Sequence, residues 1–303
     1  MKLKITALFL LACLSSCSFN KSFYQAEKLP PGIKKAFMNV TVNGVTYKYN
    51  IVNFGANFQP TFTDTLNNVL AADYTIESVV FKNNKGKNLN GWFIKGKDKP
   101  KADITLLLLH GNGGNLLSHY AGASELAEKG FQVFIFDYSG YGFSEGKATR
   151  MNVLHDADAA LDYIRSRDDV KNTKIVIYGQ SLGGHLAATV ARDNEALVDG
   201  LVIEGGFSSH KDIAAHMFKP IALLARILVK EKYKAYKSIE DFHKPVLAIY
   251  SSEDAIVPMW MGEKIYRHAH TPKSFYAIKY PHISGPEFYA DSITYKIRTM
   301  TGK

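Results

Sequence analysis

The stretch Ile175-Val176-Ile177-Tyr178-Gly179-Gln180-Ser181-Leu182-Gly183-Gly184 predicts a tight turn between a strand and a helix. A β-prone run enters the pattern Gly-x-Ser-x-Gly, and an apolar helical pattern follows it at 186–191. A serine at the apex of such a turn projects its hydroxyl into open space, and its neighbours must be small because two backbones pass close together. Free N–H groups of the following helix can stabilise negative charge there. The pattern also arises by chance, so its meaning depends on partner residues elsewhere.

Strand and helix patterns alternate along the chain from about residue 74. The run Ile104–Leu109 is entirely apolar apart from Thr105, as expected of a strand buried on both faces. The alternation predicts an α/β fold with a mostly parallel sheet that helices cover on both faces. Strands are predicted at 76–82, 89–95, 104–109, 131–136, 174–178, 201–204, 246–250 and 274–278, and helices at 118–129, 151–167, 183–193, 260–268 and 287–300.

Composition narrows the class of protein. The 303 residues are 46% hydrophobic, enough for one large α/β domain or two small ones. No long apolar run follows the N-terminus, so we expect no internal membrane span. The net charge of +9 includes clusters at 95–101 and 230–237. These clusters are consistent with anionic lipid headgroups as partners or with a plain solvated surface. No nucleic-acid-binding module is visible, so we expect no nucleic acid partner.

The N-terminus has the pattern of an export signal. Lys2 and Lys4 precede an apolar segment at 5–14, which is too short to span a bilayer comfortably. Leu14-Ser15-Ser16-Cys17 then resembles the signal of bacterial lipoproteins, in which the cysteine is lipidated and begins the mature chain. An ordinary secretory signal is the alternative. Because the four residues at 14–17 resemble the lipoprotein signal, we expect a signal peptide at 1–16 and a lipid anchor on Cys17.

A lipid anchor on Cys17 would place the protein in a bacterial cell envelope. Ser18 follows the cysteine, which resembles the pattern for passage to the outer membrane in Gram-negative bacteria. Cys13 and Cys17 are the two cysteines of the chain, and Cys13 would leave with the signal peptide, so no disulfide is expected.

A tether and an N-terminal extension are predicted to occupy 17–73, before the main domain at 74–303. Residues 18–35 are mostly polar and contain Pro30-Pro31-Gly32, and we interpret them as a tether. Val40–Val42 and Val45–Tyr49 predict two strands around the hairpin turn Asn43-Gly44. The extension has no assigned function.

A nucleophilic serine requires a base, and in a parallel sheet that base should follow the carboxyl end of a strand. His282 lies four residues after the last predicted strand, and we assign it as the base of Ser181. His110 also ends a strand, but it opens a glycine-rich loop and is interpreted as a structural histidine. Packing, surface or pocket-lining positions are assigned to His155, His185, His210, His216 and His268.

The acid that orients the base should come from a neighbouring strand end. Asp254 follows the strand at 246–250 and is favoured. Glu204 ends the preceding strand and is the alternative. Glu253 adjoins Asp254, but neighbouring loop side chains point apart, so only one of the two should reach the base. Asp137 also ends a strand and is interpreted as holding the loop at 138–142.

Donors for a developing oxyanion are expected from the loop at 110–115. Its small residues let backbone N–H groups approach a substrate carbonyl. We expect the N–H of Asn112 or Gly113, together with the N–H of Leu182, to form the oxyanion hole. A phosphate-binding loop is the alternative, but the Lys-Ser/Thr pair that closes such a motif is missing.

Four motifs together resemble the α/β-hydrolase superfamily, with the chain order Ser, Asp, His. His110–Asn115, Asp137–Gly142, Tyr178–Gly184 and Asp254-x-x-Val257-Pro258 are similar to the branch with membrane-associated lysophospholipid hydrolases and protein depalmitoylases. The resemblance covers about 74–300. It implies cleavage of carboxylic esters or thioesters without a metal or an organic cofactor. Pro281 stands before His282 where many relatives have glycine, which leaves the shape of this loop open.

The resemblance also implies a mechanism on Ser181, Asp254 and His282. Serine at the turn argues against dehalogenase or epoxide-hydrolase chemistry, which uses aspartate there. The insertion at about 208–240 would form a short cap over the pocket, either as a lid that contacts an acyl chain or as a helix packed on the domain. Its apolar face comprises Met217, Phe218, Ile221, Leu224, Ala225 and Leu228.

Two other functions remain open from the sequence. One is a serine peptidase on the same fold, and the other is a non-catalytic surface-anchored binding protein. The complete set of three candidate residues argues against a binding protein, and no β-propeller or large gating domain is visible to support a peptidase. The resemblance implies a small acyl ester or thioester as the substrate. Acyl length and oligomeric state do not follow from the sequence.

Overall fold

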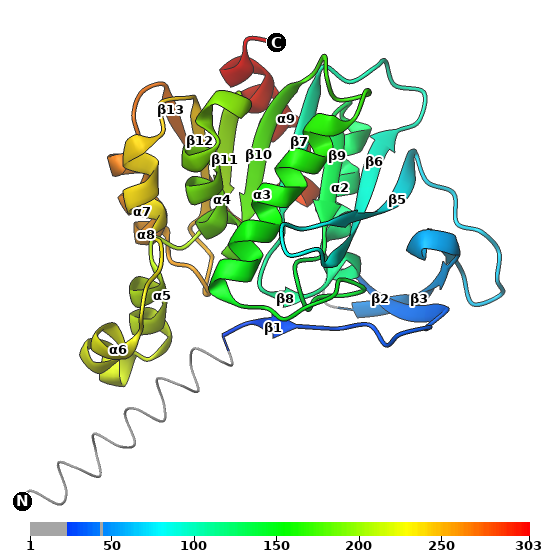
Figure 1. The fold of residues 1–303 in the computed structure, drawn as a ribbon, viewed down its shortest axis with the longest axis horizontal. Helices are drawn as coiled ribbons and strands as arrows, with labels where there is room; N and C mark the ends of the chain where they lie inside the picture. The colour runs from blue at the N-terminus through cyan, green and yellow to red at the C-terminus, as the bar shows by residue number, and fades with distance from the viewer. Residues whose placement is uncertain (1–22, 43–44) are drawn as a thin grey trace, which may run out of the picture.

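The computed structural model describes residues 23–42 and 45–303, and an eight-stranded sheet runs through its centre (Figure 1). The strand order is β13-β12-β11-β10-β7-β9-β6-β5. Six strands are parallel, and β6 is antiparallel to both β9 and β5. The predicted α/β fold with a mostly parallel sheet is confirmed. Its strands are β5 (Tyr74–Lys82), β6 (Asn88–Gly96), β7 (Ile104–Leu109), β9 (Gln132–Phe136), β10 (Lys174–Gln180), β11 (Gly200–Glu204), β12 (Val246–Ser251) and β13 (Lys273–Ile278).

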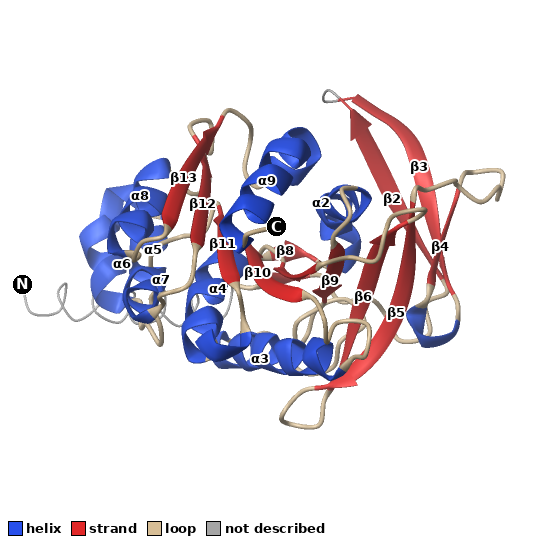
Figure 2. Cartoon of the chain, turned by 90° about the horizontal axis from the view of Figure 1, so that it is seen from above, coloured by secondary structure: helices blue, strands red, loops and turns tan. Residues whose placement is uncertain are grey.

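Helices cover both faces of this sheet (Figure 2). Helices α2 (Leu116–Glu128) and α9 (Gly285–Thr301) pack on one face. The opposite face carries α3 (Arg150–Ser166), α4 (Leu182–Asp193) and α8 (Met259–His268). Successive side chains of a strand point to opposite faces, so Leu107 and Leu109 enter one apolar layer while Leu106 and Leu108 enter the other. This double burial explains the uniformly apolar sequence of β7.

The N-terminal extension forms a separate antiparallel sheet of β2 (Lys35–Val42), β3 (Val45–Phe54) and β4 (Pro60–Thr63). The two predicted strands are present and longer than expected, whereas the turn Asn43-Gly44 lies outside the described residues. Strand β4 and the 3-10 turn η1 (Ala56–Phe58) were not predicted. Phe62 of β4 stacks on Tyr120 of α2 with ring centroids 5.0 Å apart, so the extension packs on the main domain.

The predicted tether at 18–35 differs from the structure in its described part. Gln25–Ala26 form strand β1, which pairs in parallel with β8 (Gly113–Gly114). The Phe23 side chain is buried and makes an edge contact with Phe207 at 5.9 Å between ring centroids. This segment therefore lies on the domain because an aromatic ring and a backbone ladder hold it there. The predicted signal peptide at 1–16 and Cys17 lie outside the described residues.

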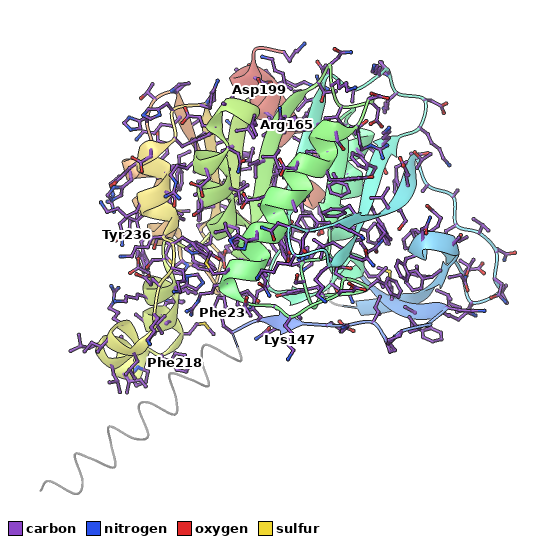
Figure 3. All side chains as sticks on the ribbon, viewed as in Figure 1. Phe23, Lys147, Arg165, Asp199, Phe218 and Tyr236 are labelled. Atoms are coloured by element: carbon purple, nitrogen blue, oxygen red, sulfur yellow. The ribbon has the colours of Figure 1, made fainter. Side chains whose placement is uncertain are left out.

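The insertion forms a small helical cap that extends from the body of the molecule (Figure 1). Phe218 lies at its end, on the opposite side of the molecule from Arg165 and Asp199 (Figure 3). Among the described residues, no helix has both the length and the apolar character needed to cross a membrane. The cap comprises α5 (His210–Met217), η3 (Lys219–Ile221) and α6 (Ala222–Leu228), followed by α7 (Ala235–Ser238) and η4 (Ile239–Asp241); η2 (Glu195–Leu197) precedes β11.

Candidate active site

Ser181 lies at the apex of the turn between β10 and α4, with φ 53° and ψ −111°. A non-glycine residue at positive φ is strained, and such strain persists only where the surroundings enforce it. A side chain on Gly183 would place its Cβ 1.8 Å from the Leu109 carbonyl oxygen, and one on Gly179 would lie 2.4 Å from the Gly183 oxygen. The two glycines are therefore required by the close approach of strand and helix, as the motif predicted.

The backbone on both sides of Ser181 is held in place. Its N–H donates to the Glu204 carbonyl oxygen at 2.9 Å, which ties the turn to the neighbouring strand β11. Leu182 is the first residue of α4, and a residue in this position has no carbonyl acceptor within its own helix. The positive end of the helix dipole therefore lies beside the Ser181 hydroxyl.

His282 and Asp254 form a hydrogen-bonded pair, with Nδ1 and Oδ2 2.6 Å apart. The other carboxylate oxygen of Asp254 accepts from the N–H groups of Ile256 and Val257 at 2.8 and 2.9 Å. The side chains of His282 and Asp254 are 13% and 1% exposed. Because a carboxylate only accepts, Nδ1 donates and Nε2 of the neutral ring keeps its lone pair. Ser181 and His282 line the same pocket.

Glu204, the alternative acid, contacts other groups. Its carboxylate accepts from the Tyr178 hydroxyl at 2.8 Å, the Gln180 amide at 2.9 Å and the Gly285 N–H at 2.6 Å. Burial raises the pKa of Glu204. Gly285 is three residues past His282, so Glu204 fixes the loop that carries the histidine. Glu253 is exposed, in agreement with the expectation that only one of the adjacent acids turns inward.

The loop around His282 is shaped by its neighbours. Ile283 has φ 52°, a strained value for a β-branched residue, and its side chain lines the pocket. Gly205 faces the imidazole, and a Cβ at this position would lie 3.1 Å from His282 Cε1. Pro281, which departs from the glycine of many relatives, precedes His282 without preventing its contact with Asp254.

The loop at 110–115 presents its peptide groups in a defined direction. The carbonyl oxygen of Gly111 lies 2.8 Å from His110 Nδ1, and that of Asn112 accepts from the Tyr141 hydroxyl at 2.9 Å. His110 and Tyr141 are buried. In a trans peptide the C=O and the following N–H point in opposite directions. The N–H groups of Asn112 and Gly113 therefore point away from these buried side chains.

The Asn112 side chain links this loop to the N-terminal segment. Its Nδ2 donates to the Phe23 carbonyl oxygen at 2.5 Å, and its Oδ1 accepts from the Gln25 N–H at 3.3 Å. His119 holds the next peptide, with Nε2 2.7 Å from the Gly113 oxygen. Burial lowers the pKa of His119, which favours its neutral form. The loop is thus fixed from two sides, by core side chains and by β1.

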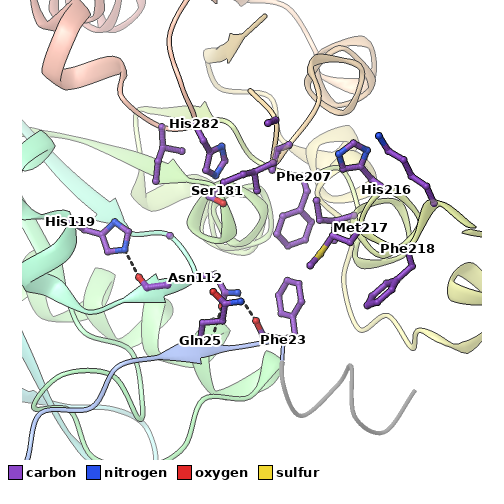
Figure 4. A pocket seen from close by; sticks show the side chains of 18 of the residues that line it. Phe23, Gln25, Asn112, His119, Ser181, Phe207, His216, Met217, Phe218 and His282 are labelled. Atoms are coloured by element: carbon purple, nitrogen blue, oxygen red, sulfur yellow. Dashed lines mark hydrogen bonds between the residues drawn. The ribbon is translucent and has the colours of Figure 1, made fainter. Parts of the chain in front are cut away.

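A pocket of about 1120 Å³ opens over Ser181 and His282 (Figure 4). Apolar side chains dominate its lining, and Phe23, Phe207 and Met217 lie around the same space as Ser181. Sequence reasoning missed Phe23, Gln25, His119 and Phe207 as lining residues. Only the aromatic character of Phe23 within a polar segment could have signalled its burial. The other lining residues include Gly111, Asn112, Gly113, Ile213, His216, Phe218, Lys219, Pro220, Ala255, Ile256, Val257 and Ile283.

The other acidic and histidine candidates from the sequence are mostly buried and bonded within the fold. Asp137 is buried, and one of its carboxylate oxygens accepts from the Leu116 N–H at 2.7 Å at the start of α2. Burial raises the pKa of Asp137 to about 7. His185 and His210 are fully buried, whereas His216 lines the pocket. Within 23–42 and 45–303, no group of three or more His, Cys, Asp or Glu side chains is arranged to hold a metal ion.

Comparison with known proteins identifies similar sequences. Residues 104–223 match the family described as alpha/beta hydrolase fold. The uncharacterized protein YfhR of Escherichia coli K12 is 32% identical over 66% of this chain and 70% of its own length. Protein bem46 of Schizosaccharomyces pombe is 26% identical over 81% of each chain.

Solved structures share the fold at lower identity. The esterase Pf2001 of Pyrococcus furiosus superposes with a TM-score of 0.63 at 17% identity, over 76% of this chain and 91% of its own. Est1E of Butyrivibrio proteoclasticus, solved with ferulic acid bound, has a TM-score of 0.60 at 17% identity, over 74% of this chain and 100% of its own. At this identity the likeness shows the fold alone.

Proposed function

The chain belongs to the α/β-hydrolase family that includes YfhR, and we propose that it is a serine hydrolase that cleaves carboxylic ester or thioester bonds. One observation carries the proposal. His282, which is hydrogen-bonded to Asp254, lines the same pocket as Ser181, and Ser181 lies at a strained turn beside a helix N-terminus. A nucleophile and a base in one cavity, with an acid bonded to the base from behind, is the arrangement that acyl transfer requires.

The reaction follows from these positions in two halves. Nε2 of His282 accepts the hydroxyl proton as Ser181 Oγ bonds to the acyl carbon. Asp254 stabilises the resulting imidazolium through Nδ1. The carbonyl oxygen becomes an oxyanion, for which we assign the N–H groups of Leu182 and of Asn112 or Gly113 as donors. The intermediate collapses, the bond to the alcohol or thiol breaks, and the leaving group takes the proton from His282.

Water completes the cycle. It donates a proton to His282, attacks the acyl carbon and releases the acid, and the proton returns to Ser181 Oγ. This scheme uses no metal and no organic cofactor. Burial of Asp254, at 1% exposure, strengthens its interaction with the imidazolium because water screens it little.

The pocket supports an apolar acyl group as the substrate. Phe23, Phe207, Met217 and Ile256 line a cavity of about 1120 Å³, which is large enough for a lipid-like chain. Pf2001, which shares the fold, is named an esterase, and Est1E was solved with ferulic acid bound. We assign acyl esters and thioesters as the substrate class, in preference to peptides.

The sequence Leu14-Ser15-Ser16-Cys17 extends the proposal to location. We assign the protein to a bacterial cell-envelope membrane, anchored through lipidated Cys17. The test is metabolic labelling with a palmitate analogue. Incorporation into the natural chain and its loss in Cys17→Ser is the expected result, and equal labelling of both would overturn the anchor.

The test of the catalytic proposal is labelling with a fluorophosphonate probe, which reacts with activated serines. The natural chain should label, whereas Ser181→Ala and His282→Ala should not. Labelling retained in Ser181→Ala would assign the reactive group to another residue. Absence of labelling in the folded natural chain, combined with no turnover of an ester series of increasing acyl length, would overturn the hydrolase assignment.

A further inference from the structure

The cap exposes a cluster of large apolar side chains. Helix α6 buries only Ala225 fully, and its Leu223 and Ile227 side chains face outward. We call the exposed set the cap patch. Leu223 and Ile227 are 74% and 68% exposed, values typical of charged surface residues rather than of leucine and isoleucine. Its members are Met217, Phe218, Ile221, Leu223 and Ile227.

The cap patch continues into the mouth of the pocket. Met217 and Phe218 belong to the patch and also line the cavity over Ser181. Ile256, on the loop after β12, lines the same cavity and is 57% exposed. Contiguous apolar surface around a pocket marks a site of interaction with a partner or a membrane.

Cationic side chains surround the patch. The segment 210–234 contains six Lys or Arg residues and two acidic residues, a net charge of +4. Arg226 pairs with Asp212 at 3.0 Å, and Lys234 pairs with Glu231 at 3.2 Å. The part of the chain that the structure describes offers no ion pair to Lys219, Lys230 or Lys232. An apolar centre with a basic rim is complementary to an anionic lipid surface.

The position of the N-terminal segment would also bring the pocket mouth close to the membrane. Phe23 lines the pocket, and Cys17 precedes it by six residues. Six residues span at most about 20 Å, so a lipid anchor on Cys17 would keep the pocket mouth within that distance of the membrane. Phe23 and Phe218 lie at the end of the molecule opposite Asp199 (Figure 3).

From these observations we infer that the cap patch inserts into an anionic lipid bilayer and opens the pocket directly onto it. The substrate class is then an ester lipid whose acyl chain passes from the bilayer into the cavity without crossing water. The inference rests on the proposed hydrolase function for its substrate, whereas the docking itself does not depend on turnover.

The double substitution Leu223→Ser/Ile227→Ser tests this docking, because neither residue lines the pocket. The full chain is placed in vesicles of phosphatidylethanolamine and phosphatidylglycerol, and hydrolysis of an embedded ester lipid is compared with that of a short water-soluble ester. Removing two aliphatic side chains that the bilayer would bury should lower the rate on the embedded lipid about tenfold or more. The rate on the water-soluble ester should not change. Tyr295→Ser on α9, where the tyrosine is 72% exposed, is the matched control and should change neither rate.

Equal rates of the double variant and the natural chain on the embedded lipid would overturn the inference and leave the hydrolase function intact. A parallel loss on both esters would also overturn it, because the patch would then support the site itself. If the natural chain cleaves neither ester, the proposed function fails, and hydrogen exchange decides the docking. Protection of 217–229 on vesicles of this composition supports it. The docking is contradicted if 217–229 show no protection on the vesicles. It is also contradicted if the same residues are protected in vesicle-free solution, because self-association would then explain the protection.

Discussion

Asn112 and Phe23 are 89 residues apart in sequence, and the Asn112 side-chain amide donates to the Phe23 carbonyl oxygen at 2.5 Å. The bond joins the loop after β7 to the segment that precedes β1. Gln25 adds a second bond to the same side chain, and β1 pairs with β8 just beyond it. The N-terminal segment therefore acts as a clamp on the loop that we assign to oxyanion binding.

The clamp predicts a kinetic effect for Asn112→Ala. The variant keeps every backbone N–H and the pairing of β1 with β8, but it removes the side-chain bonds that tie the loop to Phe23 and Gln25. Because small misplacements of positioned groups are costly, kcat should fall about tenfold with little change in KM. Steady-state kinetics on a short ester would show this. Asn53→Ala, which removes a side-chain bond to Thr63 in the extension, is the control and should leave kcat unchanged. An unchanged kcat in Asn112→Ala would contradict the role of the clamp.

Asp254→Asn should abolish most of the activity. Asparagine retains the size of the side chain but carries no charge, so it cannot stabilise an imidazolium. Its amide N–H group beside Nδ1 would favour the wrong tautomer of the imidazole. We expect kcat to fall by about 10³–10⁴. Glu204→Gln should behave differently because Glu204 contacts Tyr178, Gln180 and Gly285 rather than the imidazole.

The two acidic variants are compared by kcat and by thermal unfolding. We expect Glu204→Gln to lower stability with a smaller loss of kcat than Asp254→Asn. A larger kcat loss in Glu204→Gln would reassign the orienting acid.

Gly205→Ala should displace His282. Gly205 has φ +56°, and its Cβ would lie 3.1 and 3.2 Å from Cε1 and Nδ1 of the imidazole. Gly86→Ala is the matched control, since Gly86 has φ +70° and no atom within 4 Å of a Cβ. Each substitution should cost about 1–2 kcal/mol of unfolding free energy from the positive φ. Only Gly205→Ala should also lower kcat, and equal kcat values in both variants would refute the contact.

Acid should destabilise the fold through its buried histidines. Burial lowers the pKa of His185 to about 3, below the ordinary value of 6.5. Between these values the unfolded chain binds a proton that the native chain does not. The stability from this group is therefore complete above pH 6.5 and is lost as pH falls toward 3, at about 1.4 kcal/mol per pH unit. Burial lowers the pKa of His110 and His210 as well, which adds to the slope.

Urea unfolding at a series of pH values measures this slope. His185→Asn, which can keep a donor for the Phe207 carbonyl oxygen, should unfold more readily at neutral pH but with a shallower slope below pH 6.5. Parallel slopes in the variant and the natural chain would show that His185 titrates normally.

Several features of this protein could be predicted from local sequence. Strands in a parallel sheet end at one edge, so strand-end residues such as Ser181, Asp254 and His282 are brought toward each other by alternation alone. The glycines around Ser181 indicate a close backbone approach, which is local between Gly179 and Gly183 but extends to Leu109 of β7 for Gly183. His110 is buried, as its interpretation as a structural histidine predicts. Asp137, which is predicted to hold the loop at 138–142, accepts from the Leu116 N–H at the start of α2.

Other features depend on contacts between distant segments of the chain, so they became visible only in the folded structure. Whether Asp254 or Glu204 reaches His282 depends on how the loops after β11, β12 and β13 turn, which no local pattern encodes. The polar residues around Phe23 predict a tether, yet its ring is buried against Phe207. Local periodicity is enough to predict the alternation of strands and helices and the residues at the strand ends. The lining of the pocket and the outward face of the cap were decided by tertiary packing, because burial is a property of the whole fold.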